Sequence, residues 1–449
     1  MEDPRTGLEK QVDGLREPFA AFIGAQATAS TFLLIALLAA MVAANSPFAE
    51  VLESVKHFQL GVVFGEQTIE WSLLHLVNDG LIALFFFLIG LEVKRELIAG
   101  ELQDSSRVGL LISAAVGGMV IPAGIYLALN TGGLAGGVIS GWGIPMATDT
   151  AIAMGVLAAL AARVPKSVVA FLVGVAIIDD IGAILVIAFA YTEQLAWNAL
   201  ATAGFLLVLL LILNRAGFRH PYFYALVGIG LWVAIVQSGI HASIAGVIVA
   251  ATVPARPRIQ PGKLEQEVRS TLSDVDTDTD HIDVLGKAKT HRKVVEVENL
   301  AQVATTPLRR WEDSLELPVM LFILPVFAFL NAGVVIDGSA LKGLLLDPVA
   351  LGIMAGLVIG KPVGILLGVW LGEALGIAQR PAELTHRKLV GVGLLAGIGF
   401  TMSTFIAHLA LQPQSATLES AKLAIVVSST IAAVIGYVVL RFWSNEKHQ

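Results

Sequence analysis

The sequence predicts an all-α polytopic membrane protein with about twelve transmembrane helices. Of its 449 residues, 56% are hydrophobic and only 14% are charged, whereas soluble domains carry about 25% charged residues. The apolar residues fall in blocks of about 18 to 25, the length that crosses a hydrocarbon core of about 30 Å as a helix. Together these observations exclude a soluble protein.

The long apolar runs place the helices in order along the chain. The N-terminal segment 1–27 carries charges of both signs and no apolar stretch with a cleavage site, which argues against a removable signal peptide. We predict spans at about 28–46, 73–97, 107–130, 139–161, 166–191, 197–216, 221–238, 239–253, 316–335, 348–373, 386–410 and 419–443. The domains are then membrane parts at 28–253 and 316–443, an insert at 254–315 between them, and a tail at 444–449.

Basic residues set the orientation, because cytoplasmic joints of membrane proteins are rich in Lys and Arg. With both termini inside, only Lys56, Lys342 and Lys422 of the 29 basic residues fall in external joints. Lys361 lies within a span, and the others are cytoplasmic. The sequence therefore predicts a multi-pass protein with both termini in the cytoplasm.

Two joints between spans are long. In the external joint, the alternating stretch Phe58–Gly65 predicts a small β-hairpin. The cytoplasmic insert 254–315 is predicted to be flexible and mostly disordered, and it contains an acidic run: Asp274, Asp276, Asp278, Asp280 and Asp283. That run resembles a calcium loop, but Thr279 and Leu285 stand where the loop needs glycine and glutamate, which favours a solvated linker.

Several ionisable side chains lie inside the predicted spans. A charge there costs at least about 2.5 kcal/mol on insertion scales and usually marks an ion or proton pathway. Asp179 and Asp180 fall near the middle of the fifth span, and Lys361 falls at a similar depth in the tenth. Asp149 lies midway along the fourth. For Lys361 alone, a structural charge that balances the acids is an equal alternative.

The vicinal pair Asp179 and Asp180 predicts exchange of a cation for protons. Two carboxylates a few ångströms apart in a low dielectric cannot both ionise cheaply, so one should hold a proton near physiological pH. A small hard cation can replace that proton, because oxygen ligands suit such cations. Consecutive helix residues point about 100° apart, so we expect Asp180 to coordinate the cation and Asp179 to pair with Lys361 in one protonation state.

The fourth and eleventh spans are predicted to be interrupted helices. Pro145, Thr148 and Thr150 disturb the fourth, and the glycine-rich stretch Gly391–Thr401 disturbs the eleventh. These spans run in opposite directions, so spans 3–5 and 10–12 predict an inverted-topology repeat with a site at the midplane. Half-helix ends carry about half a charge unit, so we expect Asp149 to offset facing N-termini and Lys361 to offset facing C-termini.

Six motifs resemble, in order, those of NhaA-type sodium/proton antiporters. They are His75–Gly80, Gly90–Leu97, Ala147–Asp149, Ala176–Ala183, Gly360–Pro362 and Gly397–Ser403. The similarity runs from about Ala44 to Phe442, except for the insert, which is longer than the compact joint usual in the family. Inverted repeats are known in this family, so the predicted repeat and the resemblance are not independent of each other.

The resemblance implies electrogenic export of cytoplasmic sodium or lithium in exchange for external protons, for pH and sodium homeostasis, across a bacterial inner membrane. It implies Asp179 and Asp180 as the ion and proton site, supported by Lys361, Asp149 and Thr148. The expected substrates are Na⁺ or Li⁺ and H⁺, in contact with membrane lipids. No enzymatic activity, cofactor or nucleic-acid partner is expected. The family forms homodimers, which the sequence itself leaves open.

Further residues take roles from the resemblance. Asp79 would lie toward the external side of the ion path, and Glu92, Arg95 and Glu96 would match the cytoplasmic funnel implicated in pH activation. His241 aligns with a histidine linked to the pH response, although a lone histidine is as often structural.

Two rival functions use the same acids differently. A passive cation channel would conduct without proton movement and would give Lys361 no role. An intramembrane aspartyl protease needs two aspartates on different helices that face one another, whereas Asp179 and Asp180 are adjacent. The same carrier could also transport another ion.

Overall fold

The computed structural model describes most of the chain, with gaps at its ends and in several loops. The described ranges are 18–64, 67–100, 105–131, 137–160, 163–192, 195–257, 261–273, 288–336, 344–413 and 415–443. The acidic run 274–283 and the predicted tail 444–449 therefore lie outside the described residues.

Within these ranges, eight helices are long and apolar enough to cross a membrane. They are α2 (Pro18–Ala44), α4–η1–α5 (Leu73–His75, Leu76–Leu81, Ile82–Ala99), α6 (Ser105–Thr131), α8 (Lys166–Ala190), α9 (Trp197–Arg215), α14–η4–α15 (Pro307–Pro318, Val319–Ile323, Leu324–Asn331), α17–η5–α18 (Pro348–Ala355, Gly356–Gly360, Lys361–Ala374) and α21 (Ala416–Trp443). A bent pair, α19 (His386–Ala396) and α20 (Phe400–Ala410), adds a ninth if its 50° bend lies within one span. The chain is thus a helical multi-pass membrane protein.

Four further apolar elements are shorter. Helices α10 (Pro221–Gln237) and α11 (Ser243–Thr252) occupy the predicted seventh and eighth spans. The 3₁₀ helix η3 (Ile139–Met146) and helix α7 (Thr150–Ala158) occupy the fourth.

Two predicted boundaries differ from the structure. The first helix begins at Pro18 rather than near 28, and the ninth begins at Pro307 rather than near 316. The first turns of α14 carry Arg309, Arg310 and Glu312, so hydropathy alone places them in the preceding joint although they continue the same helical rod.

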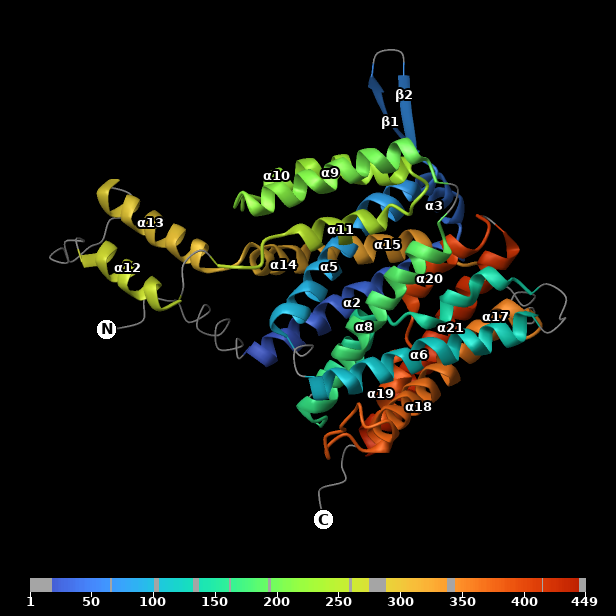
Figure 1. Ribbon diagram of the computed structural model, residues 1–449. Coiled ribbons are helices and arrows are strands. Elements are labelled where there is room, and N and C mark those ends of the chain that lie inside the picture. The colour runs from blue at the N-terminus through green and yellow to red at the C-terminus, as the bar shows by residue number, and fades with distance from the viewer. Residues whose placement is uncertain are drawn as a thin grey trace.

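A two-stranded antiparallel sheet confirms the predicted β-hairpin. Strand β1 (Gln59–Phe64) pairs with β2 (Gln67–Ser72), and Gln59 lies opposite Ser72. The sheet stands clear of the helical body (Figure 1). The short helix α3 (Ala49–Lys56), which was not predicted, precedes it.

Most of the described residues of the insert 254–315 are helical, where a mostly disordered segment was predicted. Helices α12 (Pro261–Ser273) and α13 (Ala288–Ala304) contact one another outside the helical body (Figure 1). Four half-buried apolar residues explain the pairing, namely Leu264, Val268, Val297 and Leu300. Too few apolar residues lie on this seam for a composition-based reading to detect it.

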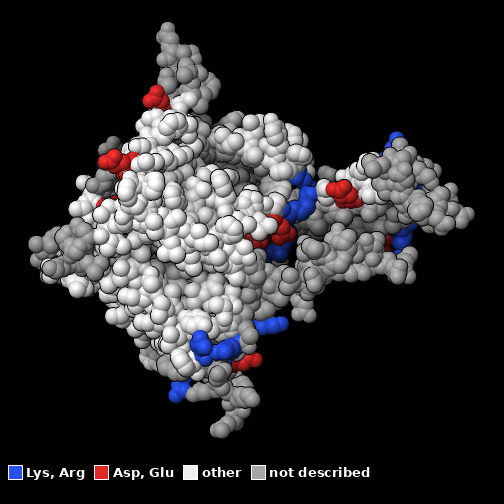
Figure 2. All heavy atoms as spheres, turned by 180° about the vertical axis from the view of Figure 1, so that it is seen from behind, with Lys and Arg blue, Asp and Glu red and all other residues white. Residues whose placement is uncertain are grey.

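The helical body presents a broad surface without charge, as a lipid-facing surface requires. Figure 2 shows one face that is almost free of charged side chains, which gather at its margins. Large apolar side chains of the membrane helices are exposed instead of being buried. Phe189 is 84% exposed and Phe205 is 70% exposed.

Helices α6 and α18 pack together through glycines, as helices do in membranes when their backbones approach closely. A Cβ atom on Gly117 of α6 would meet the carbonyl oxygen of Gly364 and the Cα atom of Gly368 on α18. This contact matters for the site described below, because α18 begins with Lys361.

We therefore expect Gly117→Ala to destabilise the protein by about 1 to 3 kcal/mol, the usual cost of an overpacked contact. Gly124→Ala on the same helix is the matched control, because nothing lies within 4 Å of its Cβ position. The measurement is the apparent unfolding temperature of each purified variant in detergent. Equal unfolding temperatures for the two variants would contradict the close approach of α6 and α18.

Candidate functional site

Two chain breaks meet in the interior of the helical body. Extended residues 147–149 separate η3 from α7, and residues 397–399 separate α19 from α20. The breaks touch directly, because the backbone N–H of Asp149 donates to the carbonyl oxygen of Ile398 at 2.6 Å. Segments about 250 residues apart in sequence therefore form one site.

Asp149 caps two helices at once. Its Oδ1 accepts from the backbone N–H of Ile152 at 3.0 Å, in the first turn of α7, and its Oδ2 accepts from the N–H of Thr401 at 2.9 Å, in the first turn of α20. The side chain is buried, with the residue only 1% exposed. One carboxylate thus lies at two positive helix N-termini, where a negative charge is favourable.

Hydroxyl groups contact the opposite, carbonyl ends of the broken helices. Thr148 Oγ1 lies 2.8 Å from the carbonyl oxygen of Ala396, the last residue of α19. Ser403 Oγ donates to the carbonyl oxygen of Ile144 in η3 at 2.7 Å. Lys361 was expected to offset these ends, but its ammonium group makes its short contact with Asp179 instead.

Asp179 and Lys361 form a fully buried ion pair. Lys361 Nζ lies 2.5 Å from Asp179 Oδ2, and both side chains are 0% exposed. Pro362, the next residue, has no backbone N–H, so the regular α-helical ladder cannot pass through it. The π-helical segment η5 ends directly before Lys361, and such segments often occur at functional sites.

Thr148 connects this ion pair to the chain break. Its Oγ1 lies 2.7 Å from Asp179 Oδ2 as well as 2.8 Å from the carbonyl oxygen of Ala396. A hydroxyl has one proton, so Thr148 can donate to only one of these two acceptors at a time. Among the described residues, the other oxygen of Asp179, Oδ1, has no hydrogen-bond partner.

Asp180 points away from this ion pair into a cavity of about 110 Å³. The cavity is lined by Asp180, Asp149, Thr148, Thr401, Glu92 and Arg95, among others, while neither Asp179 nor Lys361 belongs to its described lining. The separation follows from the 100° turn between consecutive helix residues. The two aspartates therefore have different surroundings, one paired with a lysine and one facing open space.

The Glu92 and Arg95 end of the cavity lies beside a network of ion pairs. Arg95 contacts Glu96 at 2.9 Å and Glu312 at 2.8 Å, so it joins α5 to α14. Glu92, Arg95 and Glu96 were candidate site residues from the sequence. Glu312 was not among them, because the ninth span was predicted to begin four residues later. The amphipathic pattern of Pro307–Pro318, which begins with the N-cap Thr306, is the signal that could have found it.

Asp79 and His241 form a separate cluster. His75 Nε2 lies 3.1 Å from Asp79 Oδ2, and His241 Nε2 lies 3.6 Å from Asp79 Oδ1. None of the three belongs to the described lining of the Asp180 cavity. His75 was missed as a candidate, although its position four residues before Asp79 places both on one helix face.

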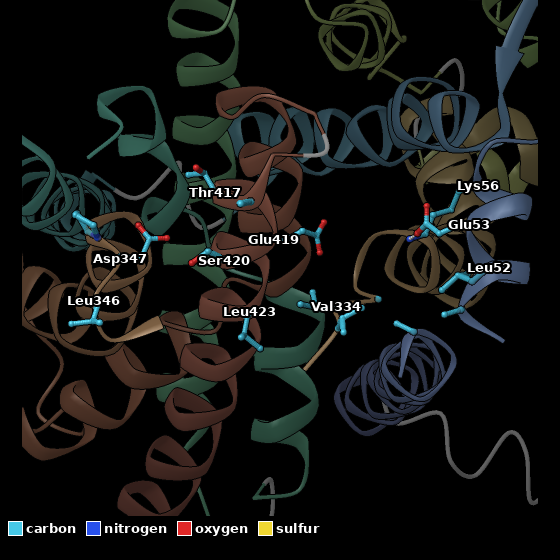
Figure 3. Close-up of a pocket in the computed structure, with 16 residues that line it drawn as sticks. Leu52, Glu53, Lys56, Val334, Leu346, Asp347, Thr417, Glu419, Ser420 and Leu423 are labelled. Carbon is cyan, nitrogen blue, oxygen red and sulfur yellow. Dashed lines mark hydrogen bonds and ion pairs between the residues drawn. The ribbon is translucent and has the colours of Figure 1, made fainter. Parts of the chain in front are cut away.

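A larger cavity, of about 890 Å³, lies elsewhere and holds none of the predicted site residues. Figure 3 shows Glu53 and Lys56 on one wall and Glu419 and Ser420 on another. Lys56 pairs with Glu53 at 2.6 Å, so this lysine is already neutralised within the wall.

Comparisons with known proteins agree on one family. A family model described as Na⁺/H⁺ antiporter 1 matches residues 20–440. Na⁺/H⁺ antiporter NhaA 1 of Shewanella denitrificans is 44% identical over 445 residues, which cover 99% of this chain and 98% of that protein. Na⁺/H⁺ antiporter NhaA 2 of Psychromonas ingrahamii is 44% identical over 99% of this chain and 94% of its own. Na⁺/H⁺ antiporter NhaA of Oleidesulfovibrio alaskensis is 43% identical over 96% of this chain and 95% of that protein.

Because Asp149 caps two helices, we expect Asp149→Ala to lower the free energy of unfolding by about 1 to 4 kcal/mol, the cost of two lost N-caps. Asp347→Ala is the matched control, since Asp347 caps only α17, through the N–H of Val349 at 2.9 Å. Thermal unfolding in detergent measures both. A loss for Asp149→Ala no larger than for Asp347→Ala would argue against the double cap.

Proposed function

This chain belongs to the NhaA-type Na⁺/H⁺ antiporter family, and from that premise we propose that Asp180 and Asp179 exchange cytoplasmic Na⁺ or Li⁺ for external H⁺. Family membership confirms the resemblance of the six sequence motifs. It also makes the chain a secondary transporter in a membrane rather than an enzyme.

The observation that carries this proposal is the different surroundings of the two aspartates. Asp180 faces the cavity, where a cation can reach it, whereas Asp179 is tied to Lys361 at 2.5 Å. A cation at Asp180 replaces the proton that otherwise neutralises this carboxylate. Protonation of Asp179 releases Lys361, so each proton that binds weakens an interaction that holds the ion-loaded state together.

The stoichiometry follows if both carboxylates take up a proton for each sodium ion released. Two protons then enter for one Na⁺ that leaves, and one net positive charge crosses inward in each cycle. The membrane potential drives such exchange, because one charge moved through 100 mV gains about 2.3 kcal/mol.

We further propose that the short elements complete twelve spans. Helices α10 and α11 and the broken rod η3–α7 cross the membrane in addition to the long helices and the bent pair. The facing breaks support an inverted repeat, in which α6, η3–α7 and α8 correspond to α17–α18, α19–α20 and α21. The distribution of Lys and Arg supports an inner-membrane location with both termini and the insert 254–315 in the cytoplasm.

Residues outside the cavity centre take supporting roles. Glu92, Arg95 and Glu96, together with Glu312, form a charged network at the cytoplasmic mouth that responds to pH. Asp79 lies on the external side of the ion path with His241 beside it, and the Asp79 contacts to two imidazoles support a role in proton entry.

The rival functions predict different measurements. A cation channel passes sodium without moving protons, and it gives no reason for the Asp179–Lys361 pair. A protease cleaves a membrane-embedded model peptide, which an antiporter leaves intact. No second candidate function is favoured by a contact in the described structure.

We expect Asp180→Asn to abolish the dissipation of a proton gradient that sodium or lithium triggers in sealed vesicles, because the amide cannot carry the charge that the cation replaces. Wild type should respond to sodium or lithium across alkaline and neutral pH. Asp347→Asn serves as control, because Asp347 lies outside the cavity of Asp180. Full exchange by Asp180→Asn would place the ion site elsewhere.

A second test concerns electrogenicity. In proteoliposomes whose potential is clamped with potassium and valinomycin, exchange of two protons for one sodium shifts the equilibrium sodium ratio about 50-fold per 100 mV. Internal and external sodium are measured at each clamped potential. An equilibrium ratio that does not depend on the potential would mean one-for-one, electroneutral exchange.

A further inference from the structure

We propose that Gln26 and Thr150 supply two neutral oxygen ligands that hold the transported cation beside Asp180. The assignment rests on the proposed function of Asp180 and adds a helix, α2, to the site. Gln26 comes from α2, and Thr150 is the first residue of α7.

Two unpartnered oxygens point to a ligand. Among the described residues, Gln26 Oε1 and Thr150 Oγ1 are buried without a hydrogen-bond partner. Gln26 is only 5% exposed, and both residues line the same cavity as Asp180. A buried polar group left without a partner costs about 1 to 3 kcal/mol. Two such oxygens around one small cavity are explained if a cation or its water occupies it.

Packing of α2 on α7 places Gln26 at this cavity. Ser30 lies one turn after Gln26 in α2. Its hydroxyl contacts the carbonyl oxygen of Ala151, the residue that follows Thr150. The same hydroxyl is 2.7 Å from the carbonyl oxygen of Gln26. Opposite Ser30 stands Gly155, where a Cβ would collide with the serine side chain. The turn of α2 that carries Gln26 is therefore fixed against the first turns of α7.

The side-chain oxygens of Asp149 and Thr148, which also line the cavity, already have partners. Both oxygens of Asp149 accept backbone N–H groups. Thr148 Oγ1 is shared between Asp179 and the end of α19. Asp180 therefore supplies the negative charge, and Gln26 and Thr150 supply free lone pairs, a donor set of oxygens that suits a hard cation.

Neutral ligands predict a specific kinetic signature. An amide and a hydroxyl do not titrate in the physiological range, so they bind the cation without competing for the proton. Their loss should weaken cation binding and leave the dependence of the exchange rate on pH unchanged when sodium is saturating. A role in packing alone would reduce stability or the maximal rate without changing the KM for sodium.

The experiment uses the full-length protein in proteoliposomes and compares wild type with Gln26→Met and Thr150→Val, which keep side-chain volume and remove the oxygens. Sodium and lithium are titrated at fixed pH. We expect each variant to raise the KM for sodium roughly threefold to tenfold, the value of one lost polar contact. The maximal rate and the pH profile at saturating sodium should stay near wild type, and Thr150→Ser, which keeps the hydroxyl, should keep the wild-type KM.

Two comparisons separate failure of this inference from failure of the proposed function. Thr31→Val is the matched control on α2, because the Thr31 hydroxyl bonds within its own helix, to Ala27, at 2.8 Å. If Asp180→Asn is inactive and both variants keep the wild-type KM, the cation site stands and the two ligands are wrong. If Thr150→Ser fails to keep the wild-type KM, Thr150 acts by packing and this inference is overturned. Exchange by Asp180→Asn would overturn both.

Discussion

A helix that breaks inside a bilayer leaves backbone groups that water cannot satisfy, so the protein must supply every partner. The Asp149 carboxylate meets this constraint for two helices, by accepting the N–H groups of Ile152 and Thr401. The hydroxyl groups of Thr148 and Ser403 contact carbonyl oxygens at the ends of α19 and η3. We call the place where the two chain breaks touch the crossing. The remaining features of the site depend on it, because it brings chain segments from both halves to one point.

The crossing also separates the two vicinal aspartates electrostatically. Asp179 faces Lys361, which α18 delivers through its glycine contact with α6. Asp180, about 100° further round the same helix, faces a separate cavity. A buried ion pair and an accessible carboxylate respond differently to protons and cations, although they are neighbours in sequence. This difference is what coupled exchange requires, since the ion and the proton must compete without sharing every ligand.

The site combines a tightly packed helix pair with a cavity. Glycines at positions such as 117 and 364 let α6 and α18 touch backbone to backbone. Around the cavity, in contrast, Gln26 and Thr150 have side-chain oxygens without a partner among the described residues. The proposed transport site needs both properties, because its ligands must stay in register while the occupant enters and leaves.

Hydrophobic length and the cost of buried charge determined much of this protein from sequence alone. Those two quantities are local, so they predicted the long helices, the membrane class and the charged residues Asp179, Asp180 and Lys361 that the structure buries. The hairpin was also predicted, because strand alternation is local.

Tertiary structure alone decided which distant residues share a surface. Glu312 was missed because its helix begins among charged residues, and Gln26 because nothing near it in sequence indicates that α2 packs on α7. Helices α12 and α13 were missed because their stability comes from contact with one another. Sequence therefore determined the charges and spans, whereas the partners of each buried oxygen depended on contacts between segments far apart in the chain, which only the folded backbone brings together.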